Sequence, residues 1–154
     1  MLRGQPEMLP SGMSSWTTLK KGGATDGWMS LYADDVAECP LILGFAKPAG
    51  RLVYSAAIKF RDLSSAAADF ASDSRSFPVA PDFSDRFTAA GGKLTRGAIT
   101  GLGGNSVVAT ITLQGVPTYV VFWQKNSFEA VVYASNVSSA EGASAATNMN
   151  GRIH

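Results

Sequence analysis

The sequence is short of the residues from which most catalytic centres are built. Its one histidine is His154, the last residue, and its one cysteine is Cys39. A serine or cysteine nucleophile needs a base beside it, and that base is usually histidine. We therefore predict no catalytic residue, and because no metal-binding or cofactor motif is present we predict no metal ligand and no cofactor. A lone cysteine cannot form an internal disulfide, so the fold must depend on its core.

Charged residues are also scarce. They make up 16% of the chain, with 13 basic and 12 acidic side chains, against about 25% in a typical globular protein. The only basic run is Lys20-Lys21, whereas nucleic-acid binding requires clustered lysine and arginine. We expect no nucleic-acid partner. No run approaches the roughly 18 apolar residues that a membrane-spanning helix needs, so no transmembrane segment is expected.

The abundance of small, uncharged polar residues favours an exported protein over a cytoplasmic one. Residues 1–7 contain no apolar segment resembling a signal peptide. An exported form would therefore have had its signal removed.

At 154 residues the chain has the usual length of one domain, and we predict a single domain over residues 1–154. Residues 1–26 are expected to be largely loop, with a short element at 14–19. Apolar runs and alternation predict strands at residues 28–33, 41–46, 52–60, 106–113, 118–123 and 128–135. Residues 28–33 are almost continuously apolar, which is typical of a strand buried on both faces or of one at the centre of a sheet. Residues 47–51 and 124–127 are predicted hairpin turns.

Two helices are predicted. In the first, over residues 62–71, an apolar stripe with helical spacing is formed by Leu63, Ala66, Ala67, Phe70 and Ala71. Asp62 or Ser64 can cap it. The second begins after Ser138, where the spacing Ser138-x-x-Glu141 matches a capping box. Gly142 weakens this second helix, so packing must hold it.

The chain also shows a pattern that predicts an internal repeat. A shift of 77 residues aligns Gly27 with Gly104, Pro40 with Pro117 and Phe45 with Phe122. Each half, 1–77 and 78–154, then reads as three strands and a helix. The predicted fold is α+β, an antiparallel sheet of about six or more strands backed by two helices. The alternative is a mainly-β barrel or sandwich with short helices. If both helices lie on one face, the other face is free for a partner.

Aromatic side chains are the strongest candidates for binding. The candidate binding residues are Trp28, Tyr32, Phe45, Tyr119, Trp123 and Phe128. Alternation places Tyr119 and Trp123 on one face of their strand and Phe122 on the other. Both faces are therefore apolar, which a monomer with one exposed sheet face would not tolerate. This indicates either an ordinary core or a buried dimer or ligand surface.

We therefore expect a non-enzymatic binding or assembly module that recognises a protein or an apolar small molecule. Recognition would use an aromatic sheet face or a groove between the halves, with a pocket rimmed by Trp123 and Phe45. One alternative is a small enzyme, with acid–base groups from Asp34, Asp35 and Glu38 and with Arg51 or Arg61 orienting an anion. The other alternative is a structural subunit of a homo-oligomer, such as a homodimer.

Overall fold

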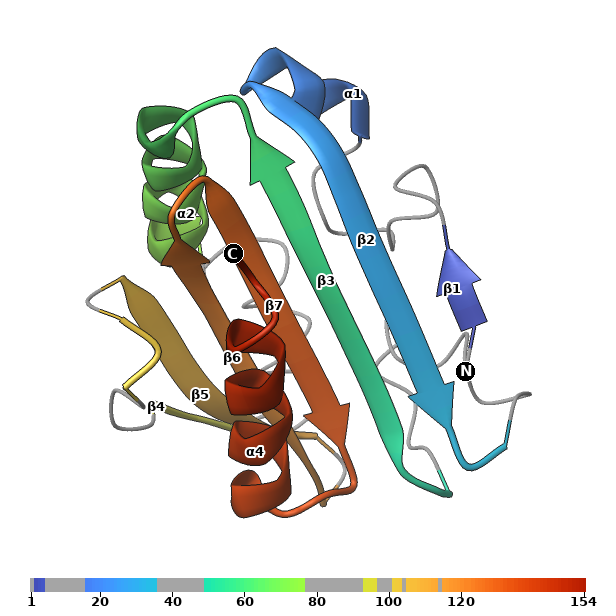
Figure 1. Ribbon diagram of the computed structural model, residues 1–154. Coiled ribbons are helices and arrows are strands. Elements are labelled where there is room, and N and C mark those ends of the chain that lie inside the picture. The colour runs from blue at the N-terminus through green and yellow to red at the C-terminus, as the bar shows by residue number, and fades with distance from the viewer. Residues whose placement is uncertain are drawn as a thin grey trace.

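One open antiparallel sheet organises the protein in the computed structural model (Figure 1). The structure describes residues 2–4, 16–35, 49–76, 93–96, 101–103, 105–113 and 115–154. The sheet runs in the order β1-β2-β3-β7-β6-β5-β4. Its strands are β1 (Leu2–Gly4), β2 (Ala24–Ala33), β3 (Leu52–Phe60), β4 (Lys93–Arg96), β5 (Ser106–Leu113), β6 (Val116–Lys125) and β7 (Phe128–Ser135). Five strands are long, and the short β1 and β4 form the two edges.

The helices in the described part of the chain are α1 (Trp16–Lys21), α2 (Leu63–Ser76) and α4 (Ser139–Asn150). None of them is long and apolar enough to cross a membrane. The predicted α+β class, with helices on an antiparallel sheet, is confirmed. The barrel alternative is wrong because β1 and β4 remain separate edges. Residues 16–26, predicted as mostly loop, form α1 and the start of β2.

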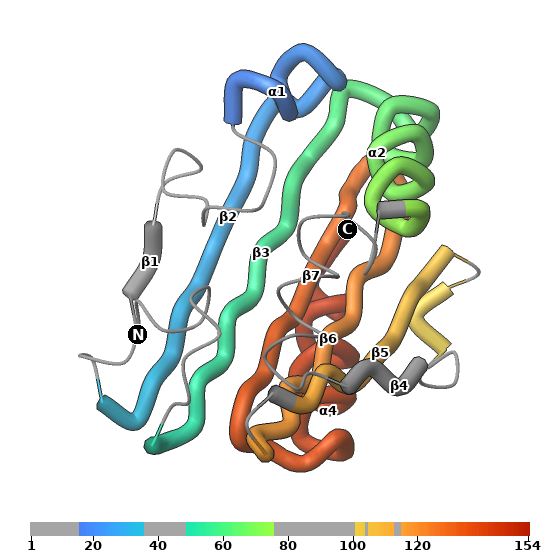
Figure 2. The backbone as a smooth tube through the Cα atoms, turned by 180° about the vertical axis from the view of Figure 1, so that it is seen from behind, coloured from blue at the N-terminus to red at the C-terminus, as the bar shows by residue number. Residues whose placement is uncertain are grey.

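The two long helices lie on opposite faces of the sheet. In Figure 1, α4 lies in front of β6 and β7, and in the reversed view of Figure 2 α2 lies in front of the same strands. Phe70 of α2 packs on Phe122, with ring centroids 5.7 Å apart. On the other face, Ala146 of α4 lies in one buried cluster with Tyr119 and Trp123. The expectation that both helices back one face is therefore wrong, and burial of both faces explains why residues 119–123 of β6 are all apolar.

The internal repeat is not confirmed by the described elements. Helix α2 contacts β3, β6 and β7, whereas α4 contacts β6 and β7 from the other side. The two edges of β3 pair with β2 and β7. The predicted strand at 41–46 lies outside the described residues, and so do Pro40 and Phe45 from the proposed alignment.

Local sequence explains where α2 begins and which face it buries. The Asp62 carboxylate accepts hydrogen bonds from the Ser65 amide at 2.7 Å and the Ser64 hydroxyl at 2.8 Å, so Asp62 is the cap. Ala66 and Phe70 are buried as predicted, but Leu63 is 61% exposed. Leu63 is the first residue of the helix and its side chain is exposed, whereas Ser65 and Ala66 in the same turn are buried.

The predicted capping box of α4 is confirmed. The Glu141 amide donates to the Ser138 hydroxyl at 3.2 Å, and the Ser138 amide donates to the Glu141 carboxylate at 2.8 Å. Gly142 then lies directly on the Tyr119 ring, because a Cβ built there would be 2.6 Å from the Tyr119 Cγ. The glycine that weakens this helix by propensity is what allows it to approach the sheet closely.

Strand β2 is covered on one face only. Met29 and Leu31 pack against the cluster that contains Tyr54 and Phe70. Trp28 and Tyr32 point to the opposite face and are 52% and 44% exposed. Of the two alternatives predicted for residues 28–33, burial on both faces is wrong, because α4 lies over β6 and β7 and does not extend over β2 (Figure 1). The strand does lie inside the sheet, paired with β1 and β3.

Candidate functional site

A pocket opens on the face of the sheet that carries α4, beside the C-terminal end of that helix. Its volume is about 380 Å³. The floor comes from β2, β3 and β7, and the wall comes from α4 and the residues after it. The lining residues are Trp28, Ala57, Phe128, Met149, Arg152, Ile153 and His154. Most of this lining is apolar, which is typical of sites for small molecules.

Strand register brings the two aromatic residues of the pocket together. Trp28 on β2 lies opposite Ala57 on β3, and Phe128 on β7 lies opposite Lys59, two residues further along β3. Side chains two residues apart on a strand share a face. The small side chain of Ala57 leaves room between its larger neighbours, and the rings of Trp28 and Phe128 lie 6.2 Å apart between centroids.

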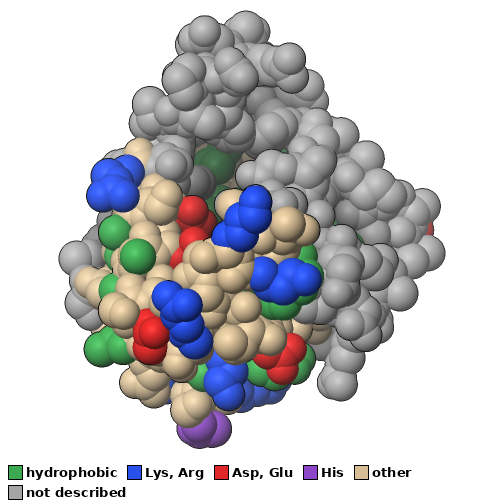
Figure 3. Space-filling model, turned by 90° about the horizontal axis from the view of Figure 1, so that it is seen from above, with side chains coloured by type: hydrophobic (Ala, Val, Ile, Leu, Met, Phe, Trp, Pro, Cys, Tyr) green, Lys and Arg blue, Asp and Glu red, His purple; other side chains and the backbone are tan. Residues whose placement is uncertain are grey.

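The rim of the pocket is basic. The Lys59 ammonium lies 5.9 Å from the centre of the Phe128 ring, close enough for a cation–π interaction. Arg152 and His154 are exposed and line the opening. Seen end-on in Figure 3, the described surface carries basic and acidic side chains interspersed with one another.

The helical wall of the pocket is fixed to the sheet by polar contacts. The Trp123 indole Nε1 donates to the Asn150 side-chain oxygen at 3.0 Å, and the Lys125 ammonium donates to the Asn150 carbonyl at 2.8 Å. Both bonds hold the last turn of α4 against β6. Met149 and Ile153, on either side of Asn150, are thereby held in place as the apolar wall.

The predicted binding residues separate into three groups. Trp28 and Phe128 meet in the pocket, and Tyr32 is exposed on the same face of β2, where its hydroxyl donates to Asp34 at 2.9 Å. Tyr119 and Trp123 are core residues beneath α4, and Trp123 is 0% exposed. The prediction that Trp123 rims the pocket is therefore wrong, because α4 covers it. Phe45 lies outside the described residues.

The acidic segment of the enzyme alternative does not form a group of converging carboxylates in the described structure. The Asp34 carboxylate accepts hydrogen bonds from the Arg51 amide at 2.9 Å and from its guanidinium at 3.1 and 3.2 Å. These bonds lower the pKa of Asp34 to about 2. Arg61 bonds to Ser65 and pairs with Asp62 at 3.3 Å. Both arginines thus have protein partners, and Glu38 lies outside the described residues.

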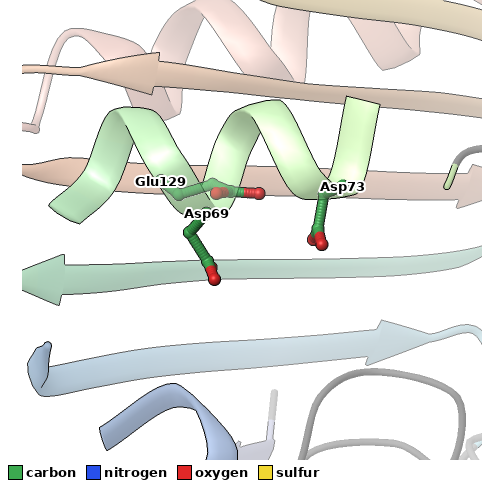
Figure 4. Close-up of side chains that lie close together, drawn as sticks. All are labelled: Asp69, Asp73 and Glu129. Carbon is green, nitrogen blue, oxygen red and sulfur yellow. The ribbon is translucent and has the colours of Figure 1, made fainter. Parts of the chain in front are cut away.

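Three carboxylates that sequence reasoning missed do converge. Asp69 and Asp73 of α2 and Glu129 of β7 each place a carboxylate oxygen within 4.8 Å of the other two (Figure 4). The sequence does contain a pattern that could have revealed this cluster. Asp69 and Asp73 are four residues apart on a predicted helix and so share a face, and Glu129 occupies an inward position of a strand that is otherwise mostly apolar.

Burial and mutual repulsion shift the ionisation of this cluster. Burial, followed by the charges of Asp73 and Asp69, raises the pKa of Glu129 to about 10. Burial and then the charge of Asp73 raise the pKa of Asp69 to about 6. Part of Asp73 reaches solvent, but the protein around its carboxyl raises its pKa as well. Burial with the charges of Asp73 and Glu129 raises the pKa of Tyr133 to about 12, so Tyr133 stays protonated beside them.

Comparison with known proteins identifies a shared fold. No family model matches the chain, and no curated protein matches it. The structure is similar to the extracellular domain of PknH from Mycobacterium tuberculosis, with a TM-score of 0.53 and 12% sequence identity. The match covers 99% of this chain and 78% of that domain. At this identity the similarity shows the class of fold, an α+β antiparallel sheet, and nothing about function.

Proposed function

We propose that the chain is a non-enzymatic binding module that holds an apolar small molecule in the pocket between Trp28 and Phe128. The observation that supports this most strongly is the exposed indole of Trp28, 52% accessible at the mouth of an otherwise apolar hollow. A large exposed aromatic side chain loses contact with water when a ligand covers it. The volume of about 380 Å³ lies within the usual range for small-molecule sites, about 300–1,000 Å³.

The rim determines what kind of apolar molecule fits. Lys59 and Arg152 place two cationic groups next to the apolar floor. An arginine beside a pocket provides hydrogen-bond donors for a carboxylate, sulfonate or phosphate. We therefore assign the occupant as an apolar ring or chain that carries one anionic group.

A fluorescence titration tests this assignment. The anionic probe 1-anilinonaphthalene-8-sulfonate should bind to the folded protein more tightly than neutral N-phenyl-1-naphthylamine. Trp28→Ala should weaken binding of both probes about tenfold, which corresponds to about 1.4 kcal/mol of lost contact. Arg152→Ala should remove only the preference for the anionic probe.

Leu63→Ala is the matched control, because Leu63 is an exposed apolar side chain on α2, outside the pocket. It should leave both affinities unchanged. Near-ultraviolet circular dichroism must show that each variant keeps its tertiary packing, since partly unfolded proteins also bind the anionic probe. Equal affinity in wild type and Trp28→Ala would contradict the proposal. Concentration-dependent dimerisation that Trp28→Ala abolishes would assign the surface to a second copy of the chain.

We also infer that the protein acts outside the cytoplasm. Low charge and a surface rich in small polar residues support this, and the similar fold belongs to an extracellular domain. Fractionation of cells that express the complete native gene tests it. Recovery of the protein in the cytoplasmic fraction alone would contradict the inference.

A further inference from the structure

We propose that Asp69, Asp73 and Glu129 bind a divalent cation between α2 and β7, and that the cation is Ca²⁺. This site lies on the face of the sheet opposite the Trp28 pocket and is independent of it. Figure 4 shows the three side chains, two from the helix and one from the strand beneath it.

The geometry allows one ion to contact all three residues. Asp69 and Asp73 are one helical turn apart, so both reach the same side of α2. Their oxygens and one from Glu129 lie within 4.8 Å of one another. Two ligands on opposite sides of Ca²⁺ are about 4.6–5.2 Å apart, twice its ligand distance, whereas those of Mg²⁺ are only about 4.0–4.2 Å apart. Oxygens at most 4.8 Å apart can all reach one Ca²⁺ ion, which accepts irregular coordination, whereas Mg²⁺ demands near-octahedral geometry.

Glu129 supplies a separate reason to expect a ligand. Glu129 is only 7% exposed, and its carboxylate oxygen Oε2 accepts no hydrogen bond from any described donor. The opposing residue on β6 is Gln124, whose amide nitrogen donates instead to the carbonyls of Leu63 at 3.4 Å and Asn126 at 3.2 Å. A buried carboxylate without a partner is costly. Either a cation, or a proton that Glu129 retains and shares in hydrogen bonds with Asp69 and Asp73, must offset that cost.

The surroundings favour a cation as the partner. In the part of the chain that the structure describes, no lysine or arginine pairs with these three carboxylates, and Arg61 is bonded to Asp62 and Ser65. Oxygen-only ligands select hard cations such as Ca²⁺ over softer transition metals. Asp73 is exposed, so an ion can enter from solvent on that side and keep water molecules in its remaining coordination positions.

Calorimetric titration of the full chain, freed of metal by a chelator and held at pH 7.5, tests the proposal. Ca²⁺ should bind with one site per chain and a dissociation constant of about 10⁻⁴–10⁻³ M, the range of weakly binding extracellular calcium modules. Mg²⁺ should bind more weakly. The midpoint temperature of thermal unfolding should rise by about 5–11 °C when Ca²⁺ is at about a hundred times its dissociation constant.

Glu129→Gln should weaken Ca²⁺ binding at least tenfold and abolish the thermal shift while the protein stays folded, because the amide keeps the shape of the side chain. Asp26→Asn is the matched control: it changes an exposed carboxylate elsewhere and should leave binding unchanged. Absence of binding to wild type at 10-fold above the expected dissociation constant would overturn the site and leave a retained proton as the partner of Glu129. Undiminished binding to Glu129→Gln would overturn it too, and tighter binding of Mg²⁺ would overturn the assignment to Ca²⁺.

Discussion

At the scale of single residues, Gly142 shows how packing can override helix propensity. Glycine costs about 1 kcal/mol relative to alanine within a helix, and on that basis Gly142→Ala would stabilise α4. The structure predicts the opposite, because the new Cβ would overlap the Tyr119 ring, with its Cγ at 2.6 Å. Tyr119 is buried and cannot move away freely.

We expect Gly142→Ala to lower the free energy of unfolding by up to about 2 kcal/mol, the cost of overpacking less the gain in propensity. Chemical denaturation measures this directly. Gly151→Ala is the matched control, since φ is −65° there and an added Cβ would meet only backbone oxygens at 3.7 Å. That variant should be neutral or slightly stabilising, and a stabilising Gly142→Ala would contradict the packing described for α4.

The carboxylate cluster also makes a prediction at the residue scale, in the dependence of stability on pH. Because the folded pKa of Asp69 is raised to about 6 and that of Glu129 to about 10, the folded state holds more protons than the unfolded state above pH 4. Stability should therefore fall as pH rises, between about pH 4 and 6 for Asp69 and onward to about pH 10 for Glu129.

Thermal unfolding in metal-free buffers across this range measures the effect. Glu129→Gln should flatten the profile above pH 6. Asp34 and Asp62 change the stability in the opposite direction, because the pKa of each is lowered to about 2. The stability that they contribute is lost as the pH falls from about 4 to 2. A wild-type profile that rises from pH 5 to 9 without metal would contradict the geometry of the cluster.

At the scale of elements, sequence patterns located most of the strands and both long helices. Residues 52–60, 106–113 and 128–135 match β3, β5 and β7, because apolar runs and turn residues mark their ends. The Asp62 and Ser138 caps mark the starts of α2 and α4 because each side chain satisfies first-turn amides.

The capping box allows a test at this scale. Ser138→Ala removes the acceptor for the Glu141 amide and should destabilise the protein by about 1 kcal/mol. Ser139→Ala, one residue further into the helix and exposed, should have little effect. Denaturant midpoints of the two variants provide the comparison. Equal midpoints would show that the box does not stabilise α4.

At the scale of the whole molecule, the sequence could not show which helix covers which face. The alternation in β2 and β6 looks similar along the chain, yet both faces of β6 are buried and one face of β2 is open. That difference depends on the placement of α4 and α2 on opposite faces, which is a property of the chain's path between elements. The pocket could not be predicted for the same reason, since it joins three strands to residues after α4.

The carboxylate cluster required the same long-range information. Asp69 and Glu129 are far apart in the sequence and meet only because α2 crosses β7. The aromatic residues were predicted to form either an ordinary core or a binding surface, and the described ones divide between buried and exposed positions. Their division into core and surface was not predictable, because it depends on where α4 ends.

Fluorine NMR of protein labelled with 5-fluorotryptophan is the most direct test of the account, because the three tryptophans sample three environments. Trp16 lies in α1, Trp28 at the pocket and Trp123 beneath α4. Titration with 1-anilinonaphthalene-8-sulfonate should shift the Trp28 resonance, assigned from its absence in Trp28→Phe, and leave the Trp123 resonance in place. A shift confined to Trp16 or Trp123, with Trp28 unmoved, would contradict both the open face of β2 and the binding site placed on it.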